Sequence, residues 1–408
     1  MSADLLVTFN AGSSTVKLGL FSIEEGSPRR VGKGVLDFRR EPLSFQLTEG
    51  PVVADIPLSA RVTDDLHDVL DEALGRLADH FDMGDIAAVG HRVVHGGDRF
   101  SGPVFVDEET LGGITELVPL APLHQPHSLR LIRAIRHLRP AEVQTASFDT
   151  AFHRTQADTV RRFALPRVLH DAGVKRYGFH GLSYKFIAAE LARREPAIAR
   201  GKIVVAHLGS GASLCALDAG ASRDSSMGFS TLDGVPMATR CGALDPGVLL
   251  HLLGPARRTL ADVENTLYHQ SGLLGVSGIS ADSRALLASD RPEAREAIDL
   301  FTFRIAGEIA RLAATLGGLD GIVFTAGIGE NQPQIRAAIG ARLGWLGLAL
   351  DPAANEANAF VIGAGTSRIA AFVVRTDEER VIADEALSLL HDKDLHAQRR
   401  APSRLLDD

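Results

Sequence analysis

Two segments far apart in the chain share one pattern. Residues 7–20 read VTFNAGSSTVKLGL and residues 204–217 read VVAHLGSGASLCAL. In each, an apolar run enters a turn of small polar residues and a second apolar run leaves it, which is typical of a β-hairpin. The tip of such a hairpin presents backbone N–H and hydroxyl donors, so two of them suggest a site that binds phosphate from two sides. Two unrelated glycine-rich hairpins would give the same pattern, and the rest of the chain must decide.

The composition is that of a globular protein with room for two domains. The chain has 408 residues, 45% hydrophobic and 23% charged. Its 43 Lys and Arg against 51 Asp and Glu give a formal charge of −8, which disfavours nonspecific binding of nucleic acid. Two cysteines cannot form a disulfide framework. The sequence has neither a signal-peptide pattern nor an apolar run near the roughly 20 residues of a membrane span. We therefore expect a cytoplasmic protein without membrane contact.

Short runs rich in Val and Ile alternate with longer amphipathic stretches, which predicts an α/β fold. Strands are expected within the segments DIAAVGHRVVH, AEVQTASFD, GKIVVAHLG and DGIVFTAGIG. Helices are expected within SLRLIRAIRHLR, SYKFIAAELARRE and the long segment that begins EAREAIDLF. In the first helix the arginines fall largely opposite the apolar residues, so we interpret them as a solvated face.

The irregular, proline-punctuated stretch after Asp149 marks a change of domain. We expect an N-terminal domain over residues 1–149 and a C-terminal domain over 150–379. A helix over 380–392 is expected to join the first domain, and the charged residues 393–408 are expected to be a frayed tail.

Polar segments interrupt the apolar runs at strand ends, where functional groups of α/β sheets gather. In GHRVVHGGDRF, an extended backbone puts Arg92 and Val94 on one face and His91 and His95 on the other. The first face suits a small carboxylate, with charge at one end and methyl contact at the other. The two histidines lack the carboxylate or thiolate partners of a zinc site. In SFDTAFH, Asp149 is either a functional carboxylate or the N-cap of the following helix.

Three further segments add candidates. His180 precedes a patterned helix for which Ser183 is the expected cap, and a histidine at a helix N-terminus can donate to a phosphoryl oxygen. Arg240 lies in a long loop of small residues, where it is either a binding residue or merely exposed. The segment DGIVFTAGIGEN, residues 320–331, predicts a strand, a glycine-rich turn and the start of a helix that holds the sugar or base of a nucleotide.

In this order, the segments resemble the acetokinase family of the acetate and sugar kinase, Hsp70 and actin superfamily. The resemblance runs through NAGSSTVK, GHRVVHGG, FDTAFH, RYGFHG, HLGSGASL, TRCG, SGLLGVSG, AGIGEN and TDEE. It implies two duplicated actin-like, ribonuclease H-like βββαβαβα domains flanking a nucleotide cleft. It further implies a homodimer that uses Mg²⁺, or Mn²⁺, and reversibly transfers the γ-phosphoryl of ATP to acetate or a similar short-chain carboxylate.

The resemblance also assigns roles by position. It assigns catalysis to Asp149, His180 and Arg240, and magnesium binding to Asn10 and Glu378. It assigns binding of the substrate to Arg92 and to the pocket-wall residues Val94, Leu123, Phe179 and Thr231. The nucleotide falls to Lys17, His207, Leu208, Gly209, Ser210, Gly211, Asp282, Ser283, Arg284, Gly327, Ile328, Gly329, Glu330 and Asn331.

These assignments agree with the chemistry of the reaction. A carboxylate is ionised at neutral pH, so the difficulty is to bring two anions together, and cationic donors such as Arg92, His180 and Arg240 ease it. Asp149 is then expected to orient magnesium, its water or an arginine rather than to remove a proton.

Several positions depart from the family's usual pattern. Ser210 stands where the family usually has Asn, Thr231 where it has Pro, and Gln125 where it has Asn, and HGLSY replaces the common HGTSH. These changes leave the charged centre intact but leave open which short carboxylate is preferred, because one methylene is worth only about 1–3 kcal/mol of discrimination.

Three alternatives to an acetate-specific enzyme remain to be weighed. A propionate kinase is the nearest. A pyrophosphate-dependent enzyme is disfavoured because Gly327 and Ile328 leave space for adenosine. A non-catalytic nucleotide switch of the actin or chaperone kind would leave Arg92, His180 and Arg240 without a role.

Overall fold

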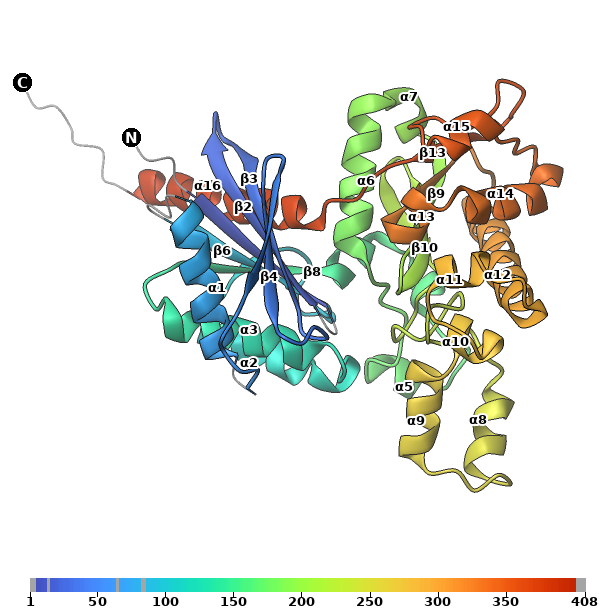
Figure 1. Ribbon diagram of the computed structural model, residues 1–408, viewed down its shortest axis with the longest axis horizontal. Coiled ribbons are helices and arrows are strands. Elements are labelled where there is room, and N and C mark those ends of the chain that lie inside the picture. The colour runs from blue at the N-terminus through green and yellow to red at the C-terminus, as the bar shows by residue number, and fades with distance from the viewer. Residues whose placement is uncertain (1–4, 13–14, 64–65, 82–85, 401–408) are drawn as a thin grey trace, which may run out of the picture. The chain divides into compact units, whose positions relative to one another are not determined.

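The computed structural model describes residues 5–12, 15–63, 66–81 and 86–400 (Figure 1). Two serines at the tip of the first hairpin, Ser13 and Ser14, lie outside the described residues. The chain divides into two compact units, one of residues 1–151 with 377–408 and the other of residues 152–376. Each unit is built around its own sheet.

The first unit holds an eight-stranded sheet in the order β5-β4-β3-β2-β1-β6-β8-β7. Its strands are β1 Leu5–Ala11, β2 Thr15–Glu24, β3 Ser27–Asp37, β4 Ser44–Glu49, β5 Val52–Pro57, β6 Ile86–Val93, β7 Val104–Phe105 and β8 Gln144–Phe148. Its helices are α1 His67–His80, α2 Glu108–Glu116, α3 Gln125–Leu138 and α16 Glu378–Arg400, with a 3₁₀ turn at Val118–Leu120 and another, Asp149–Thr155, at its end.

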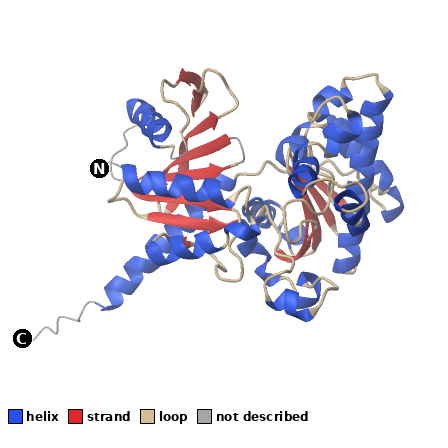
Figure 2. Cartoon of the chain, turned by 90° about the horizontal axis from the view of Figure 1, so that it is seen from below, coloured by secondary structure: helices blue, strands red, loops and turns tan. Residues whose placement is uncertain are grey.

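Helices cover both faces of this sheet (Figure 2). Side chains alternate along a strand, so Val7 and Phe9 of β1 pack into the core formed with α1 and α3. Leu6 points the other way and packs against Ala383 and Ala386 of α16. The first and last segments of the chain therefore share one core, and α16 brings its first turn to the sheet that carries the first hairpin.

The second unit holds a five-stranded sheet in the order β11-β10-β9-β12-β13. Its strands are β9 Lys202–Leu208, β10 Ala212–Asp218, β11 Ala221–Ser225, β12 Gly321–Thr325 and β13 Ala370–Val373. Its helices are α4 Asp158–Arg161, α5 Arg167–Asp171, α6 Gly181–Arg194, α7 Pro196–Ala199, α8 Pro246–Leu253, α9 Leu260–His269, α10 Gly272–Ser277, α11 Ser283–Leu287, α12 Pro292–Leu316, α13 Ala326–Asn331, α14 Pro333–Arg342 and α15 Pro352–Glu356, with a 3₁₀ turn at Gly344–Leu346.

The two sheets repeat one topology. In the first unit β3-β2-β1 are antiparallel, and β1, β6 and β8 are parallel. In the second unit β11-β10-β9 are antiparallel, and β9, β12 and β13 are parallel. The two segments of shared sequence pattern form the corresponding hairpins, β1–β2 and β9–β10. The similarity of these segments thus reflects a duplicated α/β fold, as expected.

The last helix is longer than the sequence indicated. Residues 393–400 continue α16 to Arg400, whereas a frayed tail was expected from residue 393. Extending an existing helix costs far less than starting one, so a charged segment can follow a helix that is anchored by its buried first turns. Among the described residues, no helix is both long and apolar enough to cross a bilayer.

Candidate active site

An arginine–carboxylate pair joins two parallel strands of the first unit. Arg92 lies near the end of β6, and Asp149 directly follows β8. Nε and Nη2 of Arg92 donate to the two carboxylate oxygens of Asp149, at 3.0 and 2.6 Å. The Asp149 side chain is 1% exposed and that of Arg92 14%. Both oxygens of Asp149 therefore accept from an arginine, which agrees with an orienting role.

Asn10, at the end of β1, connects this pair to α16. Its Oδ1 accepts from Nη1 of Arg92 at 3.2 Å, and its Nδ2 donates to Glu378 at 2.8 Å and to Glu379 at 2.9 Å. Burial opposes the charge on Arg92, but Asp149, Glu378 and Glu379 outweigh it and raise the pKa of the guanidinium above its usual value. Arg92 is thus a permanent cation surrounded by carboxylates.

The oxygen-rich surroundings of Asn10 fit a hard divalent cation. Mg²⁺ keeps several waters and takes one or two carboxylates from the protein, the rest coming from phosphate. Glu378 supplies such a carboxylate and Asn10 an amide oxygen. Among the described residues no group of three or more His, Cys, Asp or Glu side chains is placed to hold a metal, so a cation here would depend on the nucleotide for further ligands.

The remaining assigned residues of the first unit are Lys17, Val94 and Leu123. Lys17 of β2 lies opposite Asn10 in the hairpin register and is exposed. Val94 directly follows β6 and is buried, and Leu123, just before α3, is half-buried.

The two histidines beside Arg92 have structural partners. Nε2 of His91 bonds to Gln144 at 2.8 Å, and Nδ1 of His95 accepts from the backbone of Gly97 at 3.0 Å. Burial lowers the pKa of each histidine to about 4, so both are neutral at pH 7. The side chain of Gln125 accepts from the backbone N–H of His95 and donates to its carbonyl, at 3.2 and 2.9 Å. No local sequence pattern predicts this pair of hydrogen bonds, because it joins residues that are distant in the chain.

In the second unit, His180 occupies the N-cap position of α6 with a φ of 55°. Its Nδ1 bonds to Oγ of Ser213 on β10 at 2.8 Å, and its ring stacks on His207 of β9, with centroids 4.2 Å apart. Ser183 does not cap the helix, contrary to expectation. It lies inside the first turn, where its Oγ bonds to Nδ1 of His207 at 2.8 Å and to Thr376 at 2.9 Å.

Arg240 approaches the tip of the second hairpin together with His180. A Cβ atom built on Gly211 would lie 3.6 Å from Nε2 of His180 and 3.7 Å from Nη1 of Arg240. Nη1 of Arg240 also donates to the carbonyl of Thr231 at 3.2 Å. Of the two alternatives for Arg240, the geometry favours the binding residue. Two donors converge on the glycine of a phosphate-binding type of turn, as an anion site requires.

The loop that carries Arg240 is held by the corner between α9 and α10. Gly272, in the segment SGLLGVSG, has a φ of +63°, and a Cβ there would lie 2.1 Å from the carbonyl oxygen of Met237 and 2.7 Å from that of Arg240. The N–H of Leu273 donates to Met237, and that of Ser271 to Thr239. Only glycine fits this contact. The motif was noted in the sequence, but its effect on Arg240 was not foreseen.

The assigned nucleotide residues all belong to the second unit apart from Lys17. Asp282 caps α11 and pairs with Arg284, and Ser283 accepts from Gln332, just after α13, at 2.8 Å. The prediction of a glycine-rich turn after β12 is wrong, because α13 begins directly after the strand, with Ala326 at a φ of 64°. Glu330 makes this corner possible, because its carboxylate accepts from the N–H groups of Ala326 and of Thr376.

The other residues of this unit that the resemblance assigns to nucleotide or substrate binding differ in their exposure. Ser210 is exposed, and its carbonyl accepts from Ala238 at 3.2 Å. Phe179 and Thr231 are buried, at 1% and 9% exposed. A Cβ on Gly327 would meet nothing within 4 Å. The structure thus groups Arg92, Asp149, Asn10 and Glu378 in one unit, and His180, His207, Gly211 and Arg240 in the other.

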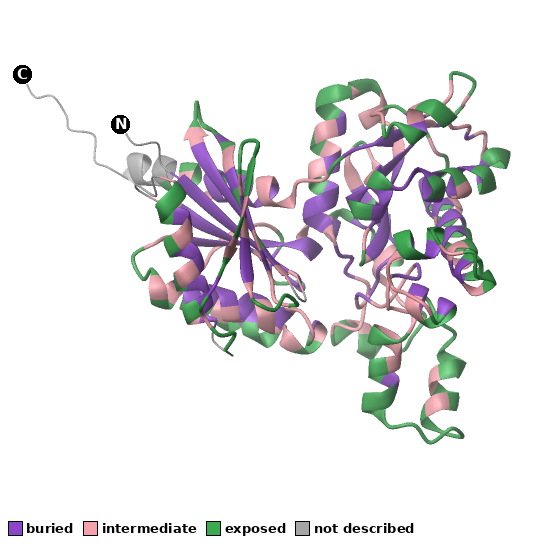
Figure 3. Cartoon of the chain, in the orientation of Figure 1, coloured by how far each residue is buried: buried purple, intermediate pink, exposed green. Residues whose placement is uncertain are grey.

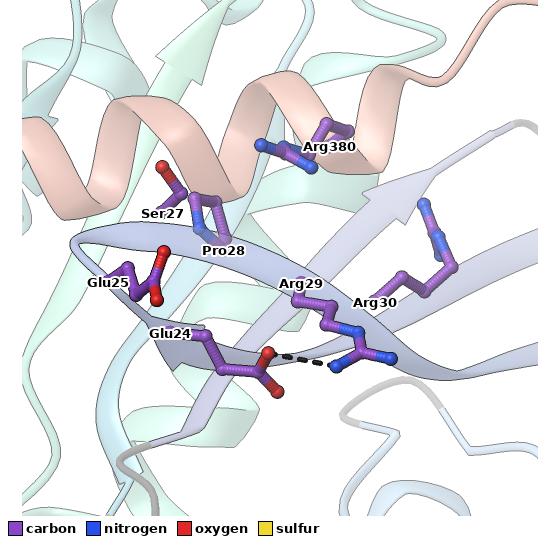
Figure 4. A pocket seen from close by; sticks show the side chains of 7 residues that line it. All are labelled: Glu24, Glu25, Ser27, Pro28, Arg29, Arg30 and Arg380. Carbon is purple, nitrogen blue, oxygen red and sulfur yellow. Dashed lines mark hydrogen bonds and ion pairs between the residues drawn. The ribbon is translucent and has the colours of Figure 1, made fainter.

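A separate open pocket lies between the β2–β3 turn and the start of α16 (Figure 4). Its three arginines are Arg29, Arg30 and Arg380. Arg29 pairs with Glu24 at 2.9 Å, Arg30 pairs with Asp377, and Arg380 pairs with Asp384 at 3.0 Å. Because carboxylates neutralise each guanidinium, this pocket is a weak candidate for an anion site.

The repeated sheet and the two polar clusters define a kinase of the actin-like superfamily, which duplicates this α/β unit. The sequence model of the acetokinase family matches residues 5–384, and the chain belongs to this family. It is 44% identical over 394 residues to the acetate kinase of Methylocella silvestris, covering 94% of this chain and 98% of the relative. It is 45% identical over 393 residues to that of Nitrobacter hamburgensis, covering 96% and 97%.

Solved structures agree. A propionate kinase from Francisella tularensis matches with a TM-score of 0.87 at 32% identity, covering 94% of this chain and 98% of its own. The acetate kinase of Porphyromonas gingivalis matches with a TM-score of 0.84 at 32% identity, covering 95% and 100%. The predicted family and fold class are confirmed. The chain is a kinase whose family phosphorylates a carboxylate.

Proposed function

We propose that this protein transfers the γ-phosphoryl group of ATP reversibly to acetate, giving acetyl phosphate and ADP, by in-line attack of the carboxylate. The observation that carries the proposal is the approach of His180 Nε2 and Arg240 Nη1 to Gly211 at a hairpin tip. Two donors at a phosphate-binding turn would stabilise equatorial oxygens whose charge changes during transfer. The membership of the acetokinase family supports the same reaction.

Arg92 would receive the acceptor carboxylate. Of its five N–H donors, two point to Asp149, and Nη1 serves Asn10 at 3.2 Å and Ala11 at 3.4 Å. Among the described partners this leaves one N–H on Nη2 for a substrate oxygen. Asp149 is then a positioning residue, which fixes the plane of the guanidinium and removes no proton. The alkyl group would contact Val94 and Leu123 of the first unit, and Phe179 and Thr231 are the candidate contacts that the second unit contributes.

Asn10 and Glu378 would hold Mg²⁺, or Mn²⁺, with the nucleotide. A cation held there would neutralise part of the charge on the phosphates. Glu378→Gln should raise the Mg²⁺ concentration for half-maximal activity by about tenfold, in the range found for altered metal environments. Glu308→Gln, on helix α12 of the other unit, is the control. An unchanged Mg²⁺ dependence in Glu378→Gln would remove Glu378 from the metal site.

Hydroxylamine trapping of acyl phosphate tests the reaction. The purified chain should form hydroxamate from acetate with ATP and Mg²⁺, and little with pyrophosphate. No product from any of formate, acetate, propionate and butyrate with either donor would refute the proposal and would favour a non-catalytic nucleotide switch.

A propionate kinase is the second candidate. It is favoured by Thr231 in place of the usual Pro at the expected pocket wall and by the structural match to a propionate kinase. The ratio of kcat/KM for acetate and propionate decides between them. A ratio above one supports acetate as the preferred substrate, and a ratio below one supports propionate.

We also propose that the protein forms a homodimer. Helix α8 contains no buried residue (Figure 3). Leu250 of α8 is 72% exposed, and Leu260 of α9 is 71% exposed. Exposed leucines on neighbouring helices are typical of an association surface. Light scattering of the purified chain tests this, and Leu250→Glu should then lower the mass toward that of the monomer.

A further inference from the structure

The strongest feature that the assigned roles leave unexplained is a line of hydroxyl groups behind His180. Tyr184 lies one helical turn after His180 on α6, so the two side chains share a face of the helix. The hydroxyl of Tyr184 bonds to Oγ of Ser213, and the same Oγ bonds to Nδ1 of His180 at 2.8 Å. Tyr184 and Ser213 are both fully buried. In this chain the tyrosine stands where the resembling sequences commonly have histidine.

The acidity of the two hydroxyls sets the direction of these hydrogen bonds. A phenol is a stronger donor than an alcohol, so Tyr184 donates to Ser213, and the single proton of Ser213 is then directed to Nδ1 of His180. A nitrogen that accepts carries no proton in the neutral ring, so the proton of His180 resides on Nε2. Nε2 is the atom that faces Gly211 beside Arg240.

We propose that Tyr184 and Ser213 are positioning residues that hold His180 as a neutral Nε2–H donor toward the transferring phosphoryl group. This inference rests on the proposed function for its catalytic meaning, but the tautomer itself does not. The described neighbours of His180 include Ser213, the stacked ring of His207 and, beside Gly211, Arg240.

The inference predicts a distinctive effect of pH. Without the Ser213 hydroxyl, the neutral ring of His180 can move its proton to Nδ1 and lose its donor toward Gly211. Protonation restores a donor at Nε2, because both nitrogens of an imidazolium carry protons. The defect of Ser213→Ala should therefore be small at acidic pH and larger at alkaline pH.

The test compares two buried serines whose hydroxyl groups each bond to Nδ1 of a histidine. Ser222 is also fully buried and bonds to Nδ1 of a histidine, His153, at 2.8 Å, but lies outside the candidate site. In the full chain, the kcat of Ser213→Ala should be within about threefold of the kcat of the unaltered protein at pH 5.5. At pH 8 it should be about tenfold lower than that of the unaltered protein. KM for acetate and for ATP should change by less than about twofold. The corresponding ratio for Ser222→Ala should be constant with pH.

Tyr184→Phe serves if Ser213→Ala does not fold. It should shift kcat in the same direction by about threefold. Its control is Tyr177→Phe, which removes a buried hydroxyl bonded to the carbonyl of Gly173 at 2.9 Å. A pH-independent ratio for both Ser213→Ala and Tyr184→Phe would overturn the inference.

Nitrogen NMR of histidine-labelled protein provides a readout that does not need activity. The His180 signals, identified by their loss in His180→Gln, should show a protonated Nε2 and an unprotonated Nδ1, and Ser213→Ala should mix the tautomers. A protonated Nδ1 in the unaltered protein would refute the relay even if the kinase is active. The expected tautomer in a protein without acyl-phosphate formation would refute the proposed function instead.

Discussion

Replacing Asp149 by asparagine removes the charge that pairs with Arg92 while keeping the size of the side chain. The amide retains one oxygen for Nε or Nη2 of the guanidinium, and its NH₂ group then faces the other donor. The Asp149 side chain is 1% exposed, so water cannot replace the lost carboxylate oxygen. Arg92 remains charged, because Glu378 and Glu379 also raise its pKa.

The size of the effect follows from this burial. Breaking a buried ion pair by removing one partner typically costs about 3–5 kcal/mol. Arg92 retains 14% exposure, and Asn10 still accepts from it, so the lower end of that range, about 3 kcal/mol, applies. If the guanidinium of Arg92 is also misplaced in the transition state, the same cost of about 3 kcal/mol applies there. Because 1.36 kcal/mol corresponds to a factor of ten, kcat/KM for acetate then falls by about a hundredfold.

Hydroxamate kinetics and urea unfolding of the same preparations measure both quantities. Glu108→Gln is the matched control, since Glu108 pairs with Arg136 at the same 2.6 Å but is 84% exposed. An exposed pair contributes at most about 1 kcal/mol, so the control should be nearly neutral. The reasoning is refuted if Asp149→Asn and Glu108→Gln lose similar stability and both keep normal turnover and Mg²⁺ dependence.

Two other predictions concern stability. Burial lowers the pKa of His91, His95 and His153 to about 4, so the unfolded chain binds protons between pH 6.5 and 4 that the folded chain does not. The free energy of unfolding in urea should therefore fall on acidification, by about 2 kcal/mol per histidine at pH 5, and equal values at pH 7 and 5 would contradict this. Gly272→Ala should lower the free energy of unfolding by about 2 kcal/mol or more and reduce kcat. Gly278 has a similar φ of +61° but no atom within 4 Å of a built Cβ, so Gly278→Ala should lower the free energy of unfolding by only about 1 kcal/mol. Similar losses for the two variants in urea unfolding would show that the close contact at Gly272 is not the cause.

The fold was predictable because its signals are local. The hairpins, the parallel strands and the helices α3, α6 and α12 are each encoded by periodicity within a few residues. Their duplicated order follows from the repeated segment pattern. The errors fell at element ends, where periodicity gives little information. Thus α16 continues to Arg400, and α13 starts at Ala326 without a turn because Glu330 accepts two backbone N–H groups.

The sequence proposes the candidate site as a set of residues but does not predict the contacts among them. Arg92, Asp149 and His180 are selected by their place at strand and helix ends, and Arg240 by its place in a long loop of small residues. That Asp149 engages Arg92, and that Ser183 bonds to His207 instead of capping α6, depends on which strands are neighbours. No local pattern carries that information, because the partners are distant in sequence.

The sequence by itself determined the family, the α/β class and the duplicated hairpins, since these depend on ordered motifs and local periodicity. Only the tertiary structure decided which donor each polar group faces. For the twin hairpins, it showed that the first brings Asn10 to Arg92 and α16, and that the second brings Gly211 to His180 and Arg240. Hydrogen bonds act over about 3 Å, so they are fixed by the register and packing of strands and not by the residues alone.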